Sequence, residues 1–284
     1  MPPPQSLTGI HILNLGVNLP GPAAAARLSE MGAAVTKVEP PGGDPFVHLS
    51  QAWYHNLCAG QQVICLDLKD TDERARLEDL LAGTDLLLTA SRLSALHRLD
   101  LGWERLHAQY PRLCQVAIVG YPSPDERAAH DLTYQAWLGL VEPPHLPRIL
   151  ISDLTGVERA VSAALSLLLQ RERGLGSGYA QVSLVESAES FLNPLRYGLT
   201  TRQGPLGGGS PRYNLYKTSD GWVAVAALEN HFWVKLCAEL GLNHETARIE
   251  DLKNVFFNQT AQAWEAWAEE RDLPVLAVHD RSTV

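Results

Sequence analysis

Residues 10–39 read IHILNLGVNLPGPAAAARLSEMGAAVTKVE, and this order of apolar and helical stretches decides the fold class. Two short apolar runs, Ile10–Leu15 and Ala34–Val38, flank a stretch of helical character, Pro22–Glu30. A strand, a helix and a second strand in this order form a βαβ unit with parallel strands. The same alternation continues through Gln62–Leu66, Asp72–Leu81, Asp85–Thr89 and Leu113–Val119. We therefore predict an α/β fold, with a doubly wound parallel sheet covered by helices on both faces.

A long helical pattern runs from Leu150 to Arg173, and a glycine-rich stretch at residues 174–178 ends it. Its apolar residues recur at helical spacing, which predicts a buried, central helix. A strand, a helix, a glycine-rich loop, a strand and a helix then predict a smaller α/β unit, at Ala180–Leu184, Val185–Tyr197, Gly204–Gly209, Trp222–Ala227 and His231–Leu240. The stretch Thr260–Arg271 is typical of an amphipathic surface helix.

These segments predict three parts of the chain. Residues 1–178 form a large doubly wound domain that includes the long central helix. Residues 179–259 form the smaller α/β domain with the glycine loop. Residues 260–284 form a C-terminal helix and tail that we expect to return to the large domain.

Composition excludes several classes of function. The chain has 284 residues, 45% of them hydrophobic, and a formal net charge of −9, which disfavours binding to nucleic acid. Its four cysteines lack the CxxC spacing of a zinc site, and no G-x-S-x-G, H-E-x-x-H, Walker or G-x-G-x-x-G motif occurs. No window reaches transmembrane length, and no secretory leader is present, so we expect a cytoplasmic protein without a bound metal or a membrane partner.

Asp153 is the first candidate for chemistry, because it begins the long apolar helix between residues that should be buried. A carboxylate that enters a core is costly unless something binds it. Spacing alone allows two roles equally: an N-cap of the helix, or a catalytic group whose pKa is raised by apolar surroundings.

His130 and Asp131 precede a predicted helix at Leu132–Leu138. Asp131 is expected to cap that helix, since a carboxylate satisfies free amides of the first turn. His130 is either a plain loop residue or a base that the positive helix end keeps neutral.

Two further candidates lie in the predicted smaller domain. Glu229 ends an apolar strand and opens a helix, where it could be a cap or a catalytic group. The three glycines Gly207, Gly208 and Gly209 could form a flexible turn, or could allow close approach of the backbone to a ligand.

An ordered series of motifs resembles the class III CoA-transferase family (CaiB/BaiF type). Within that family, the motifs are most similar to the α-methylacyl-CoA racemase branch. The series comprises LTGIHIL (7–13), PGPAA (20–24), EMGAAVTKVEPPGGD (30–44), LDLK (66–69), DLLL (85–88), HDLTYQA (130–136), Asp153 before its helix, and YNLYKTSDG (213–221). The resemblance implies two domains joined by linkers, an interlocked homodimer, and an active site between domains. It also implies that the domain of residues 1–178 is Rossmann-like and binds CoA.

The resemblance also implies two chemistries for Asp153. In the transferases, the matching aspartate attacks a thioester, forming a mixed anhydride and then an aspartyl-CoA thioester, while a loop like Gly207–Gly209 closes over it. In the racemases, residues matching His130 and Asp153 face opposite sides of the α-carbon, and one matching Glu229 supports the histidine. Backbone amides near Asp153, at a helix start, could then hold the enolate oxygen.

The resemblance implies that CoA is bound as part of the substrate and that no cofactor is held permanently. Many relatives carry an Asn-Arg-x-Lys run for the CoA phosphates, whereas this chain has NLCAGQQ at residues 56–62. Arg92 is the remaining candidate for that contact, and CoA binding is expected to involve Arg92, Asp131, Tyr134, Gly207, Gly208 and Gly209.

We expect racemase-type α-proton exchange on a 2-methylacyl-CoA thioester, because His130 and Glu229 accompany Asp153. The alternative is a CoA-transferase that moves CoA between carboxylic acids through Asp153. A second alternative is a family member that binds CoA weakly and has no activity.

Overall fold

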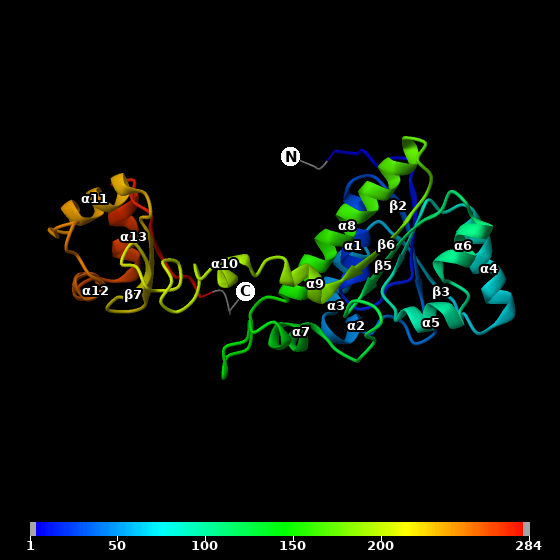
Figure 1. The fold of residues 1–284 in the computed structure, drawn as a ribbon, viewed down its shortest axis with the longest axis horizontal. Helices are drawn as coiled ribbons and strands as arrows, with labels where there is room; N and C mark the ends of the chain where they lie inside the picture. Colours follow the sequence, from blue (N-terminus) through cyan, green and yellow to red (C-terminus); the bar gives the residue numbers. More distant parts are fainter. Residues whose placement is uncertain (1–3, 281–284) are drawn as a thin grey trace. The chain divides into compact units, whose positions relative to one another are not determined.

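The computed structural model describes residues 4–280, and the chain divides into two units, residues 1–191 and 192–284 (Figure 1). The first unit contains β1 (His11–Asn14), α1 (Pro20–Glu30), β2 (Ala34–Glu39), α2 (Phe46–Leu49), α3 (Gln51–Leu57), β3 (Gln62–Cys65), α4 (Thr71–Ala82), β4 (Leu86–Thr89), α5 (Leu93–Arg98), α6 (Trp103–Gln109), β5 (Cys114–Val119), α7 (Asp131–Trp137), α8 (Ile151–Glu172), β6 (Tyr179–Ser183) and α9 (Leu184–Glu189).

The sheet of the first unit has the order β3-β2-β1-β4-β5-β6, and every pair of neighbouring strands is parallel. This is the Rossmann order, so the predicted doubly wound sheet is confirmed. Strand order reverses between β1 and β4. In sheets of this type, ligands bind outside the carboxyl ends of the strands near such a reversal.

Apolar residues point from the strands to both faces of the sheet, because successive side chains of a strand alternate. Ile12, Leu86 and Leu88 pack on the face covered by α1 and α8. Leu13 and Leu87 pack on the opposite face, against α4, α5 and α6. Figure 1 shows these two helical layers on either side of the strands. The continuous apolar runs of the sequence follow from this double covering.

Helix α8 has 22 residues and packs against α1, α9, β5 and β6, which confirms a buried, central helix. Small residues allow the close contact: a Cβ added at Gly156 would lie 2.2 Å from Cδ2 of Leu184. Despite the length of α8, no helix within residues 4–280 is apolar enough over a sufficient length to cross a membrane.

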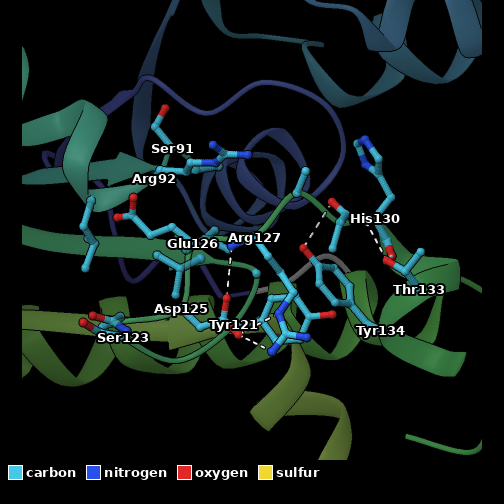
Figure 2. A pocket seen from close by; sticks show the side chains of 18 residues that line it. Ser91, Arg92, Tyr121, Ser123, Asp125, Glu126, Arg127, His130, Thr133 and Tyr134 are labelled. Atoms are coloured by element: carbon cyan, nitrogen blue, oxygen red, sulfur yellow. Dashed lines mark hydrogen bonds and ion pairs between the residues drawn. The ribbon is translucent and has the colours of Figure 1, made fainter. Parts of the chain in front are cut away.

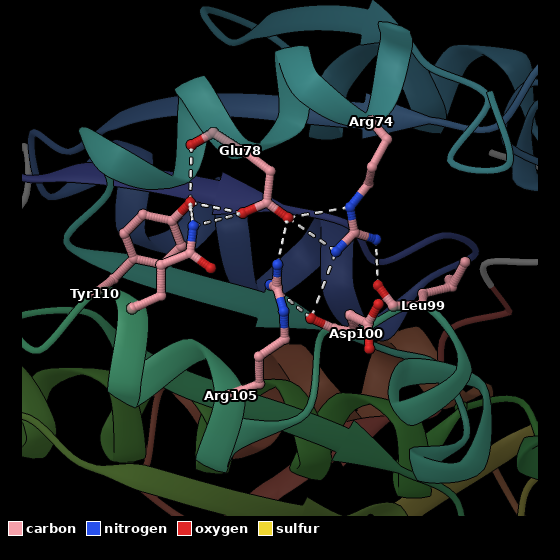
Figure 3. Close-up of polar contacts among 7 residues, drawn as sticks. Arg74, Glu78, Leu99, Asp100, Arg105 and Tyr110 are labelled. Atoms are coloured by element: carbon pink, nitrogen blue, oxygen red, sulfur yellow. Dashed lines mark hydrogen bonds and ion pairs between the residues drawn. The ribbon is translucent and has the colours of Figure 1, made fainter. Parts of the chain in front are cut away.

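On the other face, one carboxylate links α4 to α6 (Figure 3). Oε1 of Glu78 accepts from Arg74 at 3.0 Å and from Arg105 at 3.1 Å, and Oε2 accepts from the Tyr110 hydroxyl at 2.6 Å. Arg105 also donates to the carbonyl oxygen of Asp100 at 2.9 Å. Glu78 is therefore held between two cations and a phenol.

The second unit is built on a three-stranded antiparallel sheet of order β7-β8-β9. Its buried core includes Tyr216, Trp233, Phe256 and Trp264. The elements are α10 (Asn193–Arg196), β7 (Tyr213–Lys217), β8 (Trp222–Ala226), α11 (Asn230–Glu239), α12 (Ile249–Phe256), α13 (Ala261–Glu269) and β9 (Val275–Ala277).

Several element bounds differ from the sequence predictions. The predicted helix Val185–Tyr197 is two helices, α9 and α10, with a break before Pro194. A proline near that point removes a helical hydrogen bond and fits only the first turn of a new helix. The first unit extends to Phe191, past the predicted bound at residue 178.

Helix α13 is the expected amphipathic surface helix, and its apolar face packs in the core of the second unit, where Trp264 is only 4% exposed. The indole nitrogen of Trp264 donates to the carbonyl oxygen of Phe256 at 2.8 Å, so its polar atom is satisfied there. Together α13 and β9 complete the packing of that unit.

Candidate functional site

The N-terminus of α8 is capped by a side chain from another helix. Asp131 is buried, and its Oδ1 accepts from the backbone amides of Ser152 at 2.8 Å and Asp153 at 3.0 Å. Its Oδ2 accepts from the side-chain amide of Gln135 at 2.5 Å. Gln135 in turn donates to the carbonyl oxygen of Ile149 at 2.8 Å. We call these residues, with Ser152 and Asp153, the α7–α8 junction.

This geometry corrects two predictions. Asp131 was expected to cap its own helix, but it is the first residue of α7 and caps α8 instead. Asp153 was a possible N-cap, but it lies inside the first turn of α8 and its side chain makes no capping bond. Free amides at a helix start attract any carboxylate within reach, and the nearer one in space here comes from α7.

The Asp153 carboxyl is desolvated without a compensating cation. Burial, together with the neighbouring charge of Asp131, raises its pKa from the ordinary 3.8 to about 7. No hydrogen bond or ion pair to this carboxyl occurs within residues 4–280. Asp153 can therefore exist both protonated and ionised near neutral pH, with both oxygens free to meet a substrate.

The amides beside Asp153 do not have the role that we expected for them. Those of Ser152 and Asp153 both donate to Asp131, so neither is free to hold an enolate oxygen. A donor for that oxygen must come from elsewhere.

His130 and Tyr134 lie close to Asp131 in the chain, at the start of α7. His130 is exposed at the N-cap position of α7, where its backbone amide donates to Thr133 Oγ1 at 3.1 Å. Tyr134 is buried, packs edge-to-face on Tyr121 and donates to the carbonyl oxygen of Ala129 at 3.3 Å. Burial first, and then the charge of Asp153, raise the pKa of Tyr134 to about 12, so its phenol keeps its proton.

A cavity of about 490 Å³ opens at the carboxyl ends of β4 and β5 (Figure 2). Its walls include Arg92, Tyr121, Arg127, His130 and Tyr134. A concave site of this size beside the reversal of strand order is the expected place for a ligand in a sheet of this type. We call it the first cavity.

Both cationic and anionic side chains line the first cavity. Arg92 is exposed on its wall, and its charge helps to lower the pKa of Glu126, after the larger effect of hydrogen bonds from Ser94. Arg127 forms an ion pair with Asp125 and lies over the rings of Tyr121 and Trp137, at 4.3 and 4.9 Å from their centroids. Arg92 is thus the less committed of the two cations.

Glu229 and the glycine loop lie in the second unit. Glu229 occupies the N-cap position of α11, but its exposed side chain makes no capping bond, so the capping role is wrong. The loop is folded tightly on residues 198–204: a Cβ at Gly207 would lie 1.9 Å from the carbonyl oxygen of Thr201. One at Gly209 would lie 2.1 Å from that of Gln203. These glycines are required by close backbone contact within the loop itself.

The family model described as CoA-transferase family III matches residues 7–284. The chain belongs to CoA-transferase family III. The family resemblance drawn from the motifs is therefore confirmed.

Relatives of two kinds match this chain. The chain is 30% identical over 262 residues to the alpha-methylacyl-CoA racemase of Homo sapiens, covering 85% of this chain and 66% of that one. It is 28% identical over 264 residues to the succinyl-CoA–D-citramalate CoA-transferase of Chloroflexus aurantiacus, covering 84% and 66%. The chain thus spans just under two thirds of the length of these relatives, and the two kinds match about equally well.

Solved structures share the fold of this chain. A hypothetical protein from Mycobacterium tuberculosis is 22% identical, with a TM-score of 0.87, over 98% of this chain and 85% of that one. A CAIB/BAIF family protein from Brucella suis, also 22% identical, has a TM-score of 0.79 over 97% and 84%. Both describe the same architecture.

Within the family III fold, the first unit brings together His130, Asp131, Tyr134 and Asp153, with Arg92 on the wall of the same cavity as His130 and Tyr134. Sequence reasoning missed Gln135 and Arg127. Gln135 stands four residues after Asp131, a helical spacing at which an amide can hold a carboxylate. That spacing was the available signal for Gln135.

Proposed function

We propose that this protein is an acyl-CoA-processing enzyme of CoA-transferase family III, and that it exchanges the α-proton of a 2-methylacyl-CoA thioester. The observation that supports this reaction is the Asp153 carboxyl, desolvated and with a pKa of about 7. A group that must both accept and return a proton works best when its pKa lies near the working pH.

In this mechanism His130 and Asp153 act on opposite sides of the α-carbon. One of them removes the proton, the thioester becomes an enolate, and the other delivers a proton to the opposite face. Asp131 positions Asp153, because its Oδ1 fixes the first turn of α8 that carries the catalytic carboxyl. Glu229, in the second unit, is assigned its support of the histidine by resemblance alone.

CoA is the handle of the substrate in this proposal and not a resident cofactor. Arg92 would attract its phosphates, and Tyr134 would contact it from the wall of the first cavity. Asp131 is assigned to the same region, and Gly207, Gly208 and Gly209 to a loop over the ligand. We further propose an interlocked homodimer in the cytoplasm, without nucleic-acid or membrane partners.

A CoA-transferase is the second candidate, and the free oxygens of Asp153 favour it. A carboxylate oxygen would attack the thioester carbonyl, CoA would leave as a thiolate, and a mixed anhydride would form. The thiolate would then attack the Asp153 carbonyl and release the first acid, leaving an aspartyl-CoA thioester for the acceptor acid. The relatives include such enzymes. A weak CoA binder without activity is the third candidate, because NLCAGQQ replaces the basic run.

One experiment separates the three. The protein is incubated with a 2-methylacyl-CoA in deuterated water, with and without free carboxylic acids, and mass spectrometry follows α-deuterium and the acid that carries CoA. We expect deuterium uptake that is lost in His130→Ala. Transfer of CoA without uptake, unchanged in His130→Ala, would establish the transferase instead, since anhydride formation needs no second base. If neither product forms, the third candidate, a weak CoA binder without activity, would be favoured.

A further inference from the structure

The proposed proton exchange needs a donor that holds the enolate oxygen. The departing α-proton leaves its electron pair behind, and the charge collects on the thioester oxygen, where a preorganised N–H group stabilises it. The amides of Ser152 and Asp153 cannot serve, because both donate to Asp131. The turn between β1 and α1, residues 15–19, offers an alternative. It follows the carboxyl end of β1, beside the reversal of strand order where ligands bind in such sheets.

The β1–α1 turn lies at the same end of the first unit as Asp153. Helices α1 and α8 pack side by side, and both run from the carboxyl to the amino end of the sheet, since α1 follows β1 and α8 precedes β6 (Figure 1). Arg27 and Glu158 each stand seven residues after the first residue of their helix, and their Nε and Oε1 atoms are 3.3 Å apart. The two helices therefore begin at the same level to within about one turn, with axes about 10 Å apart.

The turn also borders the first cavity. A Cβ added at Gly16 would lie 3.2 Å from Cβ of Ala90, a residue of the cavity wall. The turn is thus next to the wall that we assign to CoA and next to the helix that carries the proposed catalytic carboxyl. A thioester whose α-carbon meets Asp153 can direct its carbonyl oxygen toward the turn.

Two buried side chains fix the turn by accepting from alternate amides. Oδ1 of Asn14 accepts from the amide of Gly16 at 2.8 Å, and Oδ1 of Asp44 accepts from the amide of Asn18 at 2.9 Å. Asn18 is left-handed, with a φ of 63°, and Oδ2 of Asp44 accepts from the buried Lys37 at 2.6 Å. The turn is therefore held in one conformation before any ligand arrives.

The amide between these two anchored positions is that of Val17, and it has no partner among residues 4–280. Val17 is half-buried, whereas Leu19, whose amide is also unpaired within that range, is 2% exposed. Pro20 has no N–H group. Since a backbone N–H group must find an acceptor in the protein, in water or in a ligand, the Val17 amide is the donor that a substrate can reach.

A second unpaired donor lies within the same turn. Asn14 is 0% exposed, and its Nδ2 has no partner among the described residues. The orientation of its carboxamide is fixed, because the amide of Gly16 can donate only to Oδ1. A Cβ at Gly16 or at Gly21 would lie 3.0 or 3.3 Å from that oxygen, so the carboxamide lies between the two ends of the turn. Unpaired donors cost free energy, and an anionic oxygen at the turn would offset part of it.

We propose that the backbone amide of Val17 donates to the thioester oxygen of the substrate and stabilises the enolate. The inference rests on the proposed α-proton exchange. When one base removes the α-proton, the electron pair of the C–H bond moves through the carbonyl onto this oxygen. When the other group returns a proton to the carbon, the charge leaves the oxygen again. The proton of Val17 stays on its nitrogen throughout, and Asp44 with Lys37 keeps the turn in place.

Val17→Pro tests the assignment, because it removes this one N–H group and no hydrogen bond of the fold. Val17→Ala keeps the N–H group and is the matched control. In the deuterium-exchange assay, kcat of Val17→Pro should fall by about 10²–10³-fold with little change in KM, the typical loss for one donor to an oxyanion. Val17→Ala should keep the wild-type kcat. Calorimetry should show the same CoA affinity in all three proteins.

An ester in place of the peptide bond between residues 16 and 17 removes the same N–H group without the ring of proline. It is made with the α-hydroxy acid analogue of valine, keeps the isopropyl group, and should show the same loss of kcat. Wild-type kcat in the ester variant or in Val17→Pro would overturn the role of Val17 and leave the proposed function intact. Absence of deuterium uptake by the wild-type protein would overturn both.

Discussion

Glu78 and Asp153 are both partly buried carboxyl groups in the first unit, and their surroundings are opposite. Burial alone would raise the pKa of Glu78, but hydrogen bonds from Tyr110 and Arg74 and the charge of Arg105 outweigh it, so its pKa is lowered. Asp153 is buried, and the charge that acts on its pKa is that of another acid, Asp131, and not of a cation. Its pKa rises to about 7.

The difference separates an acid that is held within the fold from one that we propose to be reactive. The polar contacts of Glu78 are made within the fold and hold α4 against α6 (Figure 3). Asp153 is held in place by its backbone amide, while its carboxyl has no partner among residues 4–280. Perturbed acids of this second kind collect at functional sites because their charge is stabilised only when a substrate or a proton arrives.

The strongest test of this contrast is turnover in matched amide variants. Asp153→Asn removes the titrating group and should lower kcat by roughly 10³-fold, a typical contribution of an acid–base residue. Glu78→Gln makes the same chemical change in the α4–α6 cluster and should leave kcat unchanged. The deuterium-exchange assay measures both. Full activity in Asp153→Asn, or equal losses in the two variants, would break the distinction.

The pH dependence of stability should also differ between the two acids. The folded-state pKa of Asp153 lies above its ordinary value of 3.8. Its contribution to the stability of the folded state is therefore present below pH 3.8 and is lost as the pH rises to about 7. The free energy of unfolding of Asp153→Asn, relative to that of wild type, should therefore rise by about 3 kcal/mol from pH 4 to pH 8, after allowance for solvent screening. Urea titrations at both pH values measure this. A constant difference between the two proteins would show that Asp153 is not desolvated.

Glu78 should show the opposite sign. Its pKa is lowered in the folded state. Its contribution to stability is therefore present above the pKa of the unfolded state and is lost as the pH falls through the pKa of the folded state. Glu78→Gln should cost about 2 kcal/mol at pH 7, because it leaves two partly buried arginines without their shared anion, and less at low pH. Thermal unfolding at pH 7 and pH 4 checks this. Equal destabilisation at both would assign the effect to packing.

Much of the fold followed from the sequence, because periodicity and burial have the same physical cause. The strands of the first sheet and helix α8 were identifiable from apolar runs and helical spacing. Strand β9, of three residues, was too short to stand out from a loop. The burial of Trp264 was not foreseeable either, since an amphipathic helix does not reveal which unit its apolar face meets.

The residues proposed for the site were named from the sequence, but the contacts between them were not predicted. Asp153 was singled out because a carboxylate that enters an apolar core is costly unless something binds it, and His130 because it stands at a predicted helix start in a motif that resembles the family. That Asp131 caps α8 and not α7 could not be read from the chain, because the contact joins residues 21 and 22 positions apart. Burial of Asp153 likewise depends on tertiary packing.

The smallest expected effect concerns Asp131, the acidic neighbour of Asp153. Asp131→Asn keeps one oxygen that can accept from Ser152 and Asp153, so α8 should remain capped. Its new amide nitrogen cannot accept from Gln135 as Oδ2 does, and the loss of that hydrogen bond should cost about 1 kcal/mol of stability. The variant removes a negative charge beside Asp153, which favours ionisation, so the pKa of Asp153 should fall and the pH dependence of kcat should shift toward lower pH. Asp131→Ala is the comparison: it also removes the cap of α8 and should cost about 1 kcal/mol of stability more than Asp131→Asn. A pH profile that is unchanged in Asp131→Asn would mean that burial alone sets the pKa of Asp153, and the contrast with Glu78 would then rest on cations and not on the pairing of two acids.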